Sequence, residues 1–249
     1  MTARILLSFL LLPLLPLAAQ EATKAHRELV DRVKASKPLR VLFVGNSYSF
    51  KIPRAFETLA KEEGKNVEVE QLTKGGWTLA KHAKAEATLE KIAAKKWDIV
   101  VLQEQSQTPA FPEGQRRQVM DPAAKSLADA IRKAGAIPVF FQTWGRRDGD
   151  KQNAKTYPND TFKAMQKRLT DGYRNAAKAA GNAHVIPVGE IWAKVLASGD
   201  GDKLYSKDGS HPASDGNKLG ATVFYSAFFD ELPEQSDFKQ ASAAQLLQK

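Results

Sequence analysis

The sequence contains no cysteine. This absence excludes disulfide bonds, thiolate-bound zinc, iron–sulfur clusters and a cysteine nucleophile. Histidine is scarce as well, with four in 249 residues, and no two of them have the His-x-x-x-His spacing of a helical zinc site. The sequence also lacks the P-loop, zinc-finger and RRM signatures. We therefore expect a function that needs neither a metal ion nor an organic cofactor.

Regions dominated by one sign of charge are also missing. Lysine and arginine outnumber aspartate and glutamate by 37 to 28, which gives a formal net charge of +9. The densest basic group, in 80–96, is interleaved with Glu86 and Glu90. Such mixed charge is typical of a solvated helix face, so we expect no nucleic-acid partner. The 43% of hydrophobic residues is ordinary for a globular protein and argues against several membrane spans.

A long apolar run occurs only at residues 5–19, where Ser8, Pro13 and Pro16 interrupt it. The run follows Arg4 and ends in small residues, a pattern typical of a secretory signal peptide. An uncleaved membrane anchor is the alternative, but the run is short for a span and contains two prolines. We predict a signal peptide at 1–20, with export to the periplasm or the medium and no stable membrane insertion after cleavage.

The remaining chain alternates short apolar runs with amphipathic segments. The runs predict strands at 39–45, 67–72, 98–103, 137–142 and 184–188. The other segments predict helices at 52–63, 78–95, 115–133, 160–180, 189–197 and 215–230. This alternation favours parallel strands with helical crossovers. We predict a flavodoxin-like three-layer α/β/α sandwich with a five-stranded parallel sheet, in one domain over 35–232, between a lead-in at 21–34 and a polar tail at 233–249.

Polar, glycine-rich segments follow the predicted strands. Ligands of open parallel sheets bind outside the carboxyl ends of the strands, so these segments are expected to meet at one rim. Ser47 follows the first strand and could act as a nucleophile if a base lies within hydrogen-bond reach. His211 is the best candidate base, and Asp208 could orient its ring. The backbone N–H groups of Ser47 and Gly76 could stabilise an oxyanion.

Each of these residues also has a purely structural interpretation. Asn46 or Ser47 could cap the helix at 52–63. Asp208-Gly209 is a common turn sequence, and a histidine in a loop is often only solvated. The catalytic interpretation therefore depends on all of the residues meeting at one rim.

The arrangement resembles the SGNH (GDSL-like) hydrolases. Gly45-Asn46-Ser47 after the first strand is similar to the first block of that family, which carries the nucleophilic serine, more often as Gly-Asp-Ser. Gly76-Trp77-Thr78 is similar to the block with the oxyanion glycine, and Asp208-Gly209-Ser210-His211 to the final Asp-x-x-His block. The resemblance covers nearly the whole mature chain. It implies a triad of Ser47, His211 and Asp208 and the flavodoxin-like fold.

The third block of the family departs from the usual pattern. The family has Gly-x-Asn-Asp there, with an asparagine side chain that donates to the oxyanion, whereas this chain has 103–107 with the sequence QEQSQ. A glutamine amide is chemically equivalent and one methylene longer. We predict Gln105 as the donor, with Gln103 and Gln107 as alternatives. The variant resembles an SGNH subgroup of exported bacterial proteins.

Other side chains could shape the substrate site. Trp77 and Trp144 could stack on a sugar ring or be half-buried core residues, and Gln103 is a further weak candidate for substrate contact. Arg146 and Arg147 could hold an anionic group, although a solvated loop is the favoured interpretation. His82 is expected on the surface of a helix.

Together these patterns predict an exported serine hydrolase that cleaves carboxylic esters through an acyl-enzyme. The substrate would be a small-molecule or carbohydrate ester, for example an O-acetyl group. The alternatives are a lysophospholipase or thioesterase that acts on lipid acyl chains, acetyl transfer by the same triad, and a non-catalytic carbohydrate-binding module on a degenerate fold of this type.

Overall fold

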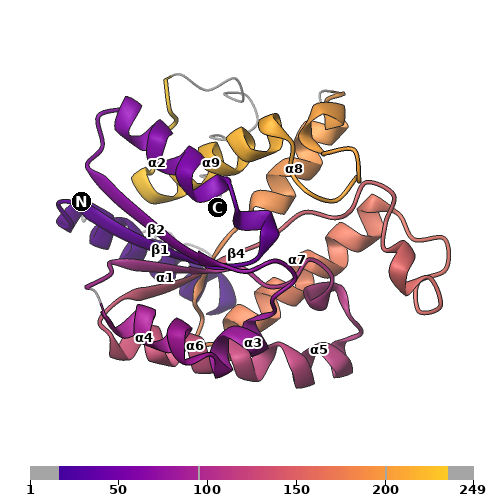
Figure 1. The fold of residues 1–249 in the computed structure, drawn as a ribbon, viewed down its shortest axis with the longest axis horizontal. Helices are drawn as coiled ribbons and strands as arrows, with labels where there is room; N and C mark the ends of the chain where they lie inside the picture. Colours follow the sequence, from indigo (N-terminus) through magenta and orange to yellow (C-terminus); the bar gives the residue numbers. More distant parts are fainter. Residues whose placement is uncertain (1–16, 95, 200, 235–249) are drawn as a thin grey trace, which may run out of the picture.

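The computed structural model describes residues 17–94, 96–199 and 201–234. In this part of the chain five parallel strands form a sheet in the order β2-β1-β3-β4-β5 (Figure 1). They are β1 (Leu39–Gly45), β2 (Val67–Thr73), β3 (Ile99–Leu102), β4 (Ile137–Phe141) and β5 (His184–Ile186). Helices cover both faces of this sheet, so the predicted three-layer α/β/α fold is confirmed.

Each face of the sheet has its own set of helices (Figure 1). One face carries α2 (Ile52–Glu62), α8 (Val188–Ala197) and α9 (Ser214–Phe229). The other carries α3 (Leu79–Lys84), α4 (Glu86–Ala94), α6 (Asp121–Lys133) and α7 (Phe162–Ala179), with α5 (Glu113–Val119) packed against α6 and α7. Helix α9 packs closely on α2, since a Cβ at Gly220 would lie 2.8 Å from the Ile52 side chain.

Strand β1 shows why the sequence favours burial on both faces. Val41 and Phe43 point into the core beneath α2 and α9, whereas Leu42 and Val44 point into the core beneath α3, α4 and α6. Successive strand residues point to opposite faces, so a strand covered on both sides needs an uninterrupted apolar run. This run ends at Gly45, where the polar rim begins.

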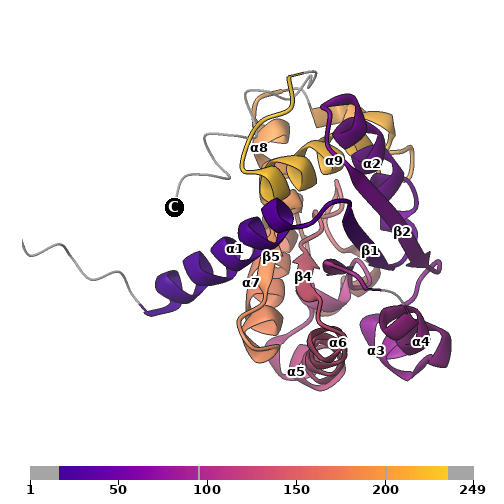
Figure 2. The same ribbon diagram turned by 90° about the vertical axis from the view of Figure 1, so that its left-hand side faces the viewer.

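Helix α1 (Leu17–Ala35) precedes the sheet and lies beside β5 (Figure 2). Its Leu29 and Val33 are buried in the same core as α9. The predicted lead-in therefore belongs to the packed fold. Most of the predicted signal peptide and nearly all of the predicted tail lie outside the described residues. Within the described ranges, no helix is long and apolar enough to span a membrane.

Two helices that we predicted as continuous are each divided in two. The segment 78–95 breaks at Ala85, whose backbone is extended with φ −89° and ψ 116°. The segment 115–133 breaks at Met120, two residues before Pro122. Pro122 lies in the first turn of α6, where its missing backbone N–H needs no partner, and it cannot donate the hydrogen bond that would continue α5 into α6, which explains the second break.

Candidate functional site

Ser47 follows strand β1, which lies between β2 and β3 in the sheet, and is the first residue of a single turn of 3-10 helix, Ser47–Ser49. Asn46 is the N-cap of this turn, because its side-chain oxygen accepts a hydrogen bond from the Tyr48 N–H at 3.2 Å. Asn46 therefore caps this short turn, and the predicted cap of the helix at 52–63 by Asn46 or Ser47 is wrong, because the N-cap of α2 is Lys51. The cap presents Ser47 at the carboxyl edge of the sheet.

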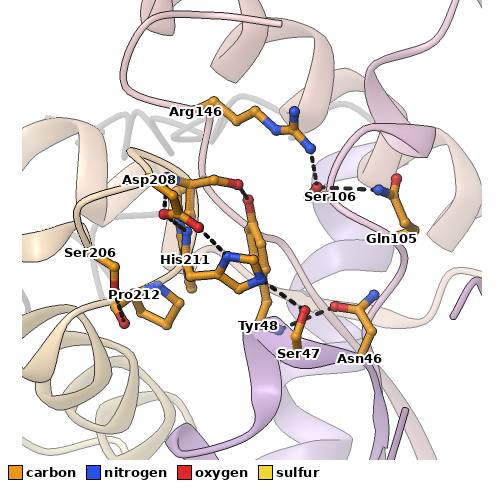
Figure 3. Close-up of polar contacts among 12 residues, drawn as sticks. Asn46, Ser47, Tyr48, Gln105, Ser106, Arg146, Ser206, Asp208, His211 and Pro212 are labelled. Carbon is orange, nitrogen blue, oxygen red and sulfur yellow. Dashed lines mark hydrogen bonds and ion pairs between the residues drawn. The ribbon is translucent and has the colours of Figure 1, made fainter. Parts of the chain in front are cut away.

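Ser47, His211 and Asp208 form a continuous hydrogen-bonded chain (Figure 3). Ser47 Oγ lies 2.9 Å from His211 Nε2, and His211 Nδ1 lies 2.5 Å from Asp208 Oδ2. A carboxylate can only accept, so Nδ1 carries a proton and Nε2 of the neutral ring is free to accept from the serine hydroxyl. The three side chains predicted to act together therefore have the mutual geometry of a nucleophile, a base and an orienting acid.

Asp208 and His211 belong to one tight turn. Asp208 Oδ1 accepts hydrogen bonds from the backbone N–H groups of Ser210 at 2.9 Å and His211 at 3.0 Å. Gly209 has a φ of +66°, a conformation that favours glycine. Ser206 N donates to the His211 carbonyl oxygen at 2.8 Å and closes the turn. The acid and the base are thereby held in one local unit.

The Asp208 carboxylate is stabilised by its partners. Desolvation alone would raise its pKa, but hydrogen bonds from the His211 ring and from the backbone N–H groups of Ser210 and His211 outweigh this effect. The pKa of Asp208 is therefore lowered below its ordinary value of 3.8. The carboxylate is ionised throughout the neutral range, as required to orient His211.

A stack of aromatic rings supports the triad from inside. Tyr48 stacks on Trp144 with ring centroids 5.0 Å apart, and Trp144 stacks on Trp192 at 4.0 Å. The indole N–H of Trp144 donates to the Ser210 carbonyl oxygen at 3.0 Å. Trp144 is completely buried, so the prediction that it contacts substrate is wrong. A tryptophan directly after a strand can face either the substrate or the core. Trp144 is buried against Trp192 and is therefore a core residue.

The Gly76 loop lies next to the serine turn. Asn46 Nδ2 donates to the Trp77 carbonyl oxygen at 3.0 Å, and Lys74 N donates to the Gly45 carbonyl oxygen at 3.1 Å. Gly76 has a φ of +68°. Within the described residues, the backbone N–H groups of Gly76 and Ser47 have no hydrogen-bond acceptor. Both donors are therefore available, and their role in an oxyanion hole stays a prediction.

The three glutamines after β3 have different roles. The Gln103 side chain is buried and donates to Asn46 Oδ1 and to the Glu104 carbonyl oxygen. Gln107 Nε2 donates to Asp150 at 2.7 Å. Both amides are thus committed to structural bonds, which contradicts the predicted substrate contact of Gln103 and removes both as alternative oxyanion donors.

Gln105 alone of the three is partly exposed. Its Oε1 accepts from the N–H of Gln107 at 2.8 Å and of Thr108 at 3.3 Å, which fixes the orientation of the amide. Its Nε2 has only long contacts of 3.4 Å, to Ser106 Oγ and Gln107 Oε1. Gln105 remains the best side-chain candidate for the oxyanion hole.

Two buried titratable residues hold the rim from below. The Glu104 side chain accepts from Leu79 N at 3.1 Å and from Gln105 N at 2.6 Å, so it links the start of α3 to the glutamine segment. Burial raises its pKa to about 7. His82 is also fully buried, and its Nε2 lies 2.9 Å from the Gly45 carbonyl oxygen, so the predicted surface position is wrong.

Sequence reasoning placed the segment 103–107 at the rim but gave Glu104 no role of its own. The signal that could have found it is a carboxylate directly after a buried strand, between two glutamines. Trp77 is the one predicted substrate-contacting residue that stays partly exposed, next to Gly76 and with Lys74 Nζ 4.3 Å above its ring. Across the described ranges, no group of three metal-ligating side chains is assembled.

The sequence matches no family model and no curated protein. Solved structures, however, are similar over most of the chain. A candidate SGNH hydrolase from Slackia heliotrinireducens is 29% identical with a TM-score of 0.60, over 76% of this chain and 98% of that one. A DUF4886 family protein from Bacteroides uniformis is 20% identical with a TM-score of 0.70, over 84% and 93%.

An acetylxylan esterase from Geobacillus stearothermophilus, solved as a catalytic mutant, is 12% identical with a TM-score of 0.55, over 78% of this chain and 95% of that one. At this identity the similarity concerns the fold. The three structures show that the chain has the fold of the SGNH hydrolases. The candidate hydrolase, at 29% identity, also supports the prediction of an enzyme that hydrolyses ester bonds.

Proposed function

We propose that the protein is an exported serine esterase that uses Ser47, His211 and Asp208 as its catalytic triad. The single observation that carries the proposal is the unbroken chain from Ser47 Oγ to His211 Nε2 and from His211 Nδ1 to Asp208 Oδ2, at 2.9 Å and 2.5 Å. A serine hydroxyl becomes a useful nucleophile only beside an oriented base, and here the base is His211, oriented by Asp208.

Acylation follows from this geometry. Ser47 Oγ attacks the ester carbonyl carbon while His211 Nε2 takes the hydroxyl proton, and the negative charge moves to the carbonyl oxygen. The N–H groups of Ser47 and Gly76 and the amide of Gln105 stabilise that oxyanion. The tetrahedral intermediate then collapses, the alkoxide leaves with the proton from His211, and Ser47 carries the acyl group. Asp208 stabilises the imidazolium during both steps.

Deacylation repeats the sequence with water. His211 accepts a proton from the water molecule, the resulting hydroxide attacks the acyl carbonyl, and Ser47 leaves as the protonated hydroxyl. The products are a carboxylic acid and an alcohol. No step needs a group outside the chain and the substrate. An alcohol in place of water would give acyl transfer, so product analysis with an added alcohol separates transfer from hydrolysis.

For the substrate, we propose small or carbohydrate esters with a short acyl group such as acetyl. The acetylxylan esterase among the structural neighbours supports this class. Trp77 also supports it, because a partly exposed indole beside the proposed oxyanion hole can stack on a sugar ring. The N-terminal segment 1–20 supports export, and an exported enzyme would meet polymeric carbohydrate esters outside the cytoplasm. Fractionation of cells that express the full chain tests export directly.

The function is tested with p-nitrophenyl acetate and with a fluorophosphonate that labels activated serines. We expect turnover in the wild type, and a loss of several powers of ten in kcat in both Ser47→Ala and His211→Ala, because nucleophile and base act as a unit. Ser36→Ala is the matched control, since Ser36 directly follows α1 and its Oγ donates to the Arg32 carbonyl oxygen in the last turn of that helix. Labelling of Ser47 by mass spectrometry identifies the nucleophile. A folded wild type without turnover or labelling would favour the binding module instead.

A further inference from the structure

Arg146 is a basic residue at the rim that the proposed mechanism does not use. It follows the buried Trp144-Gly145 pair after β4, and its backbone is fixed on both sides. Its N–H donates to Met165 Sδ at 3.3 Å, and its carbonyl oxygen accepts from Gly149 N at 3.0 Å. The side chain therefore starts from a well-defined position.

The guanidinium of Arg146 has few partners. Nη2 donates to Ser106 Oγ at 3.2 Å, whereas Nε is buried and has no hydrogen-bond partner. Within the described ranges, Arg146 has no carboxylate within salt-bridge distance, unlike Arg116 with Asp121 and Arg168 with Asp160. A charge that is partly removed from water without a counter-charge is costly, so an anion from outside the chain would be stabilised beside it.

The guanidinium faces the reaction centre. In Figure 3, Arg146, Ser106 and Gln105 lie on one side of the Tyr48 hydroxyl and the Ser47–His211–Asp208 chain lies on the other. Tyr48 is next to Ser47 in sequence, and its hydroxyl lies 2.5 Å from Ser210 Oγ, in the triad turn. The Arg146 charge also acts on the Tyr48 hydroxyl, where it opposes the effect of burial.

We propose that Arg146, held in place by the buried Ser106 hydroxyl, binds a carboxylate on the substrate, so that the enzyme prefers esters carrying a carboxylate close to the scissile bond. This inference rests on the proposed function and names a substrate class for it. A guanidinium offers several N–H donors in a planar fork that matches a carboxylate, and the Arg146 side chain is partly exposed at the rim. The substrate would thus supply the missing counter-charge.

The carboxylate could belong to the acyl part or to the alcohol part of the ester, and two substrate pairs distinguish these cases. For the acyl part, p-nitrophenyl hemisuccinate is compared with p-nitrophenyl butyrate. For the alcohol part, 4-acetoxybenzoate is compared with its methyl ester. We expect wild-type kcat/KM to be higher for the anionic member of at least one pair.

Arg146→Gln is expected to lower kcat/KM for that anionic ester by about 10- to 100-fold, the effect of losing a charge-assisted hydrogen bond. The loss should appear mainly in KM, and hydrolysis of the neutral esters should change less than about threefold, because a carboxylate contact acts in the ground state as well as in the transition state. Arg146→Lys should keep part of the preference. Arg54→Gln, an exposed position on α2, is the control with the same change in net charge.

Two results would overturn the inference. One is an anionic-to-neutral ratio that is the same in the wild type and in Arg146→Gln for both pairs. The other is a wild-type kcat/KM that is no higher for the anionic member of either pair. Failure of the proposed function itself would look different, since the neutral esters would then not be hydrolysed in a Ser47-dependent way.

Discussion

The side-chain amide of Asn46 donates to the backbone carbonyl oxygen of Trp77, 3.0 Å away. This hydrogen bond joins the turn that carries Ser47 to the loop that carries Gly76. The oxygen of the same amide accepts from Tyr48 N and from Gln103 Nε2, so Asn46 lies at the centre of the rim. Asn46 therefore helps to set the spacing between the two backbone donors of the proposed oxyanion hole, together with the bond from Lys74 N to the Gly45 carbonyl oxygen.

Asn46→Asp tests this dependence. The new carboxylate keeps the acceptor for Tyr48 and Gln103 but places a second oxygen against the Trp77 carbonyl oxygen. We expect a loss of about 1–3 kcal/mol in stability from the broken buried hydrogen bond, together with at least about a tenfold loss in kcat because the Gly76 loop shifts. Thermal melts and kinetics with p-nitrophenyl acetate measure both. Asn66→Asp, at an exposed position, is the control, and a wild-type kcat in Asn46→Asp would disprove the positioning role.

Gln105→Glu tests the side-chain donor of the oxyanion hole. Glutamate keeps the oxygen that accepts from Gln107 N and Thr108 N but removes the N–H groups. If Gln105 donates to the oxyanion, kcat should fall about 100- to 1000-fold with little change in KM. Gln107→Glu serves as the comparison, because Gln107 is committed to Asp150 and its loss should lower the melting temperature. A loss in kcat below about tenfold for Gln105→Glu would leave the hole to backbone N–H groups alone.

Asp208→Asn and Asp208→Ala should differ in an informative way. Asparagine can still accept from the backbone of Ser210 and His211, but its amide would face His211 Nδ1 and favour the wrong tautomer. We expect a loss of about 100- to 10,000-fold in kcat for this variant. Alanine leaves room for water to accept from Nδ1, since the Asp208 side chain is 49% exposed, and should cost less. Steady-state kinetics on both variants decide the order, and an equal loss would exclude the tautomer effect.

Glu104 should make stability depend on pH near neutrality. Burial raises its folded pKa from 4.5 to about 7, so the folded state binds more protons than the unfolded state between these values. Stability should therefore fall as pH rises from about 4.5 to about 7 and change no further above that. The difference is on the order of 1–3 kcal/mol.

Glu104→Gln removes this titration while keeping the acceptor for Leu79 and Gln105. We expect it to be more stable than the wild type at pH 8 and similar at pH 5, as measured by urea unfolding. The lowered pKa of His82 gives a dependence of opposite sign, which is common to both proteins and cancels in the difference. The exposed Glu90→Gln should follow the wild type, and a Glu104→Gln difference that does not vary with pH would contradict the assignment.

Most of the sheet could be predicted from sequence because β1, β3 and β4 are buried on both sides and are therefore continuous apolar runs, whereas the edge strand β2 shows the alternation of a half-exposed strand. Helix continuity was harder to predict. The segment around Ala85 is rich in alanine and lysine, which favour a helix locally, but the bond between His82 and Thr88 requires two helices. Pro122, by contrast, was a visible signal for the break at Met120.

In the candidate site, too, some residues could be predicted from sequence and others could not. Ser47, Asp208 and His211 could be identified because each follows a strand or lies in a glycine turn, and the fold brings such segments to one edge. The roles of the three glutamines and of Trp144 could not be predicted, because they depend on which neighbour each side chain meets. Only packing distinguishes the buried Gln103 from the partly exposed Gln105.

The packing of α9 on α2 has a consequence for folding. Ser47 and His211 are 164 residues apart in sequence, and each is followed closely by one of these two helices. Contacts of such long range carry a large loop-closure entropy and form after local structure. During refolding, helical circular dichroism should therefore recover before ester turnover. The return of turnover should coincide with the packing of α9 on α2.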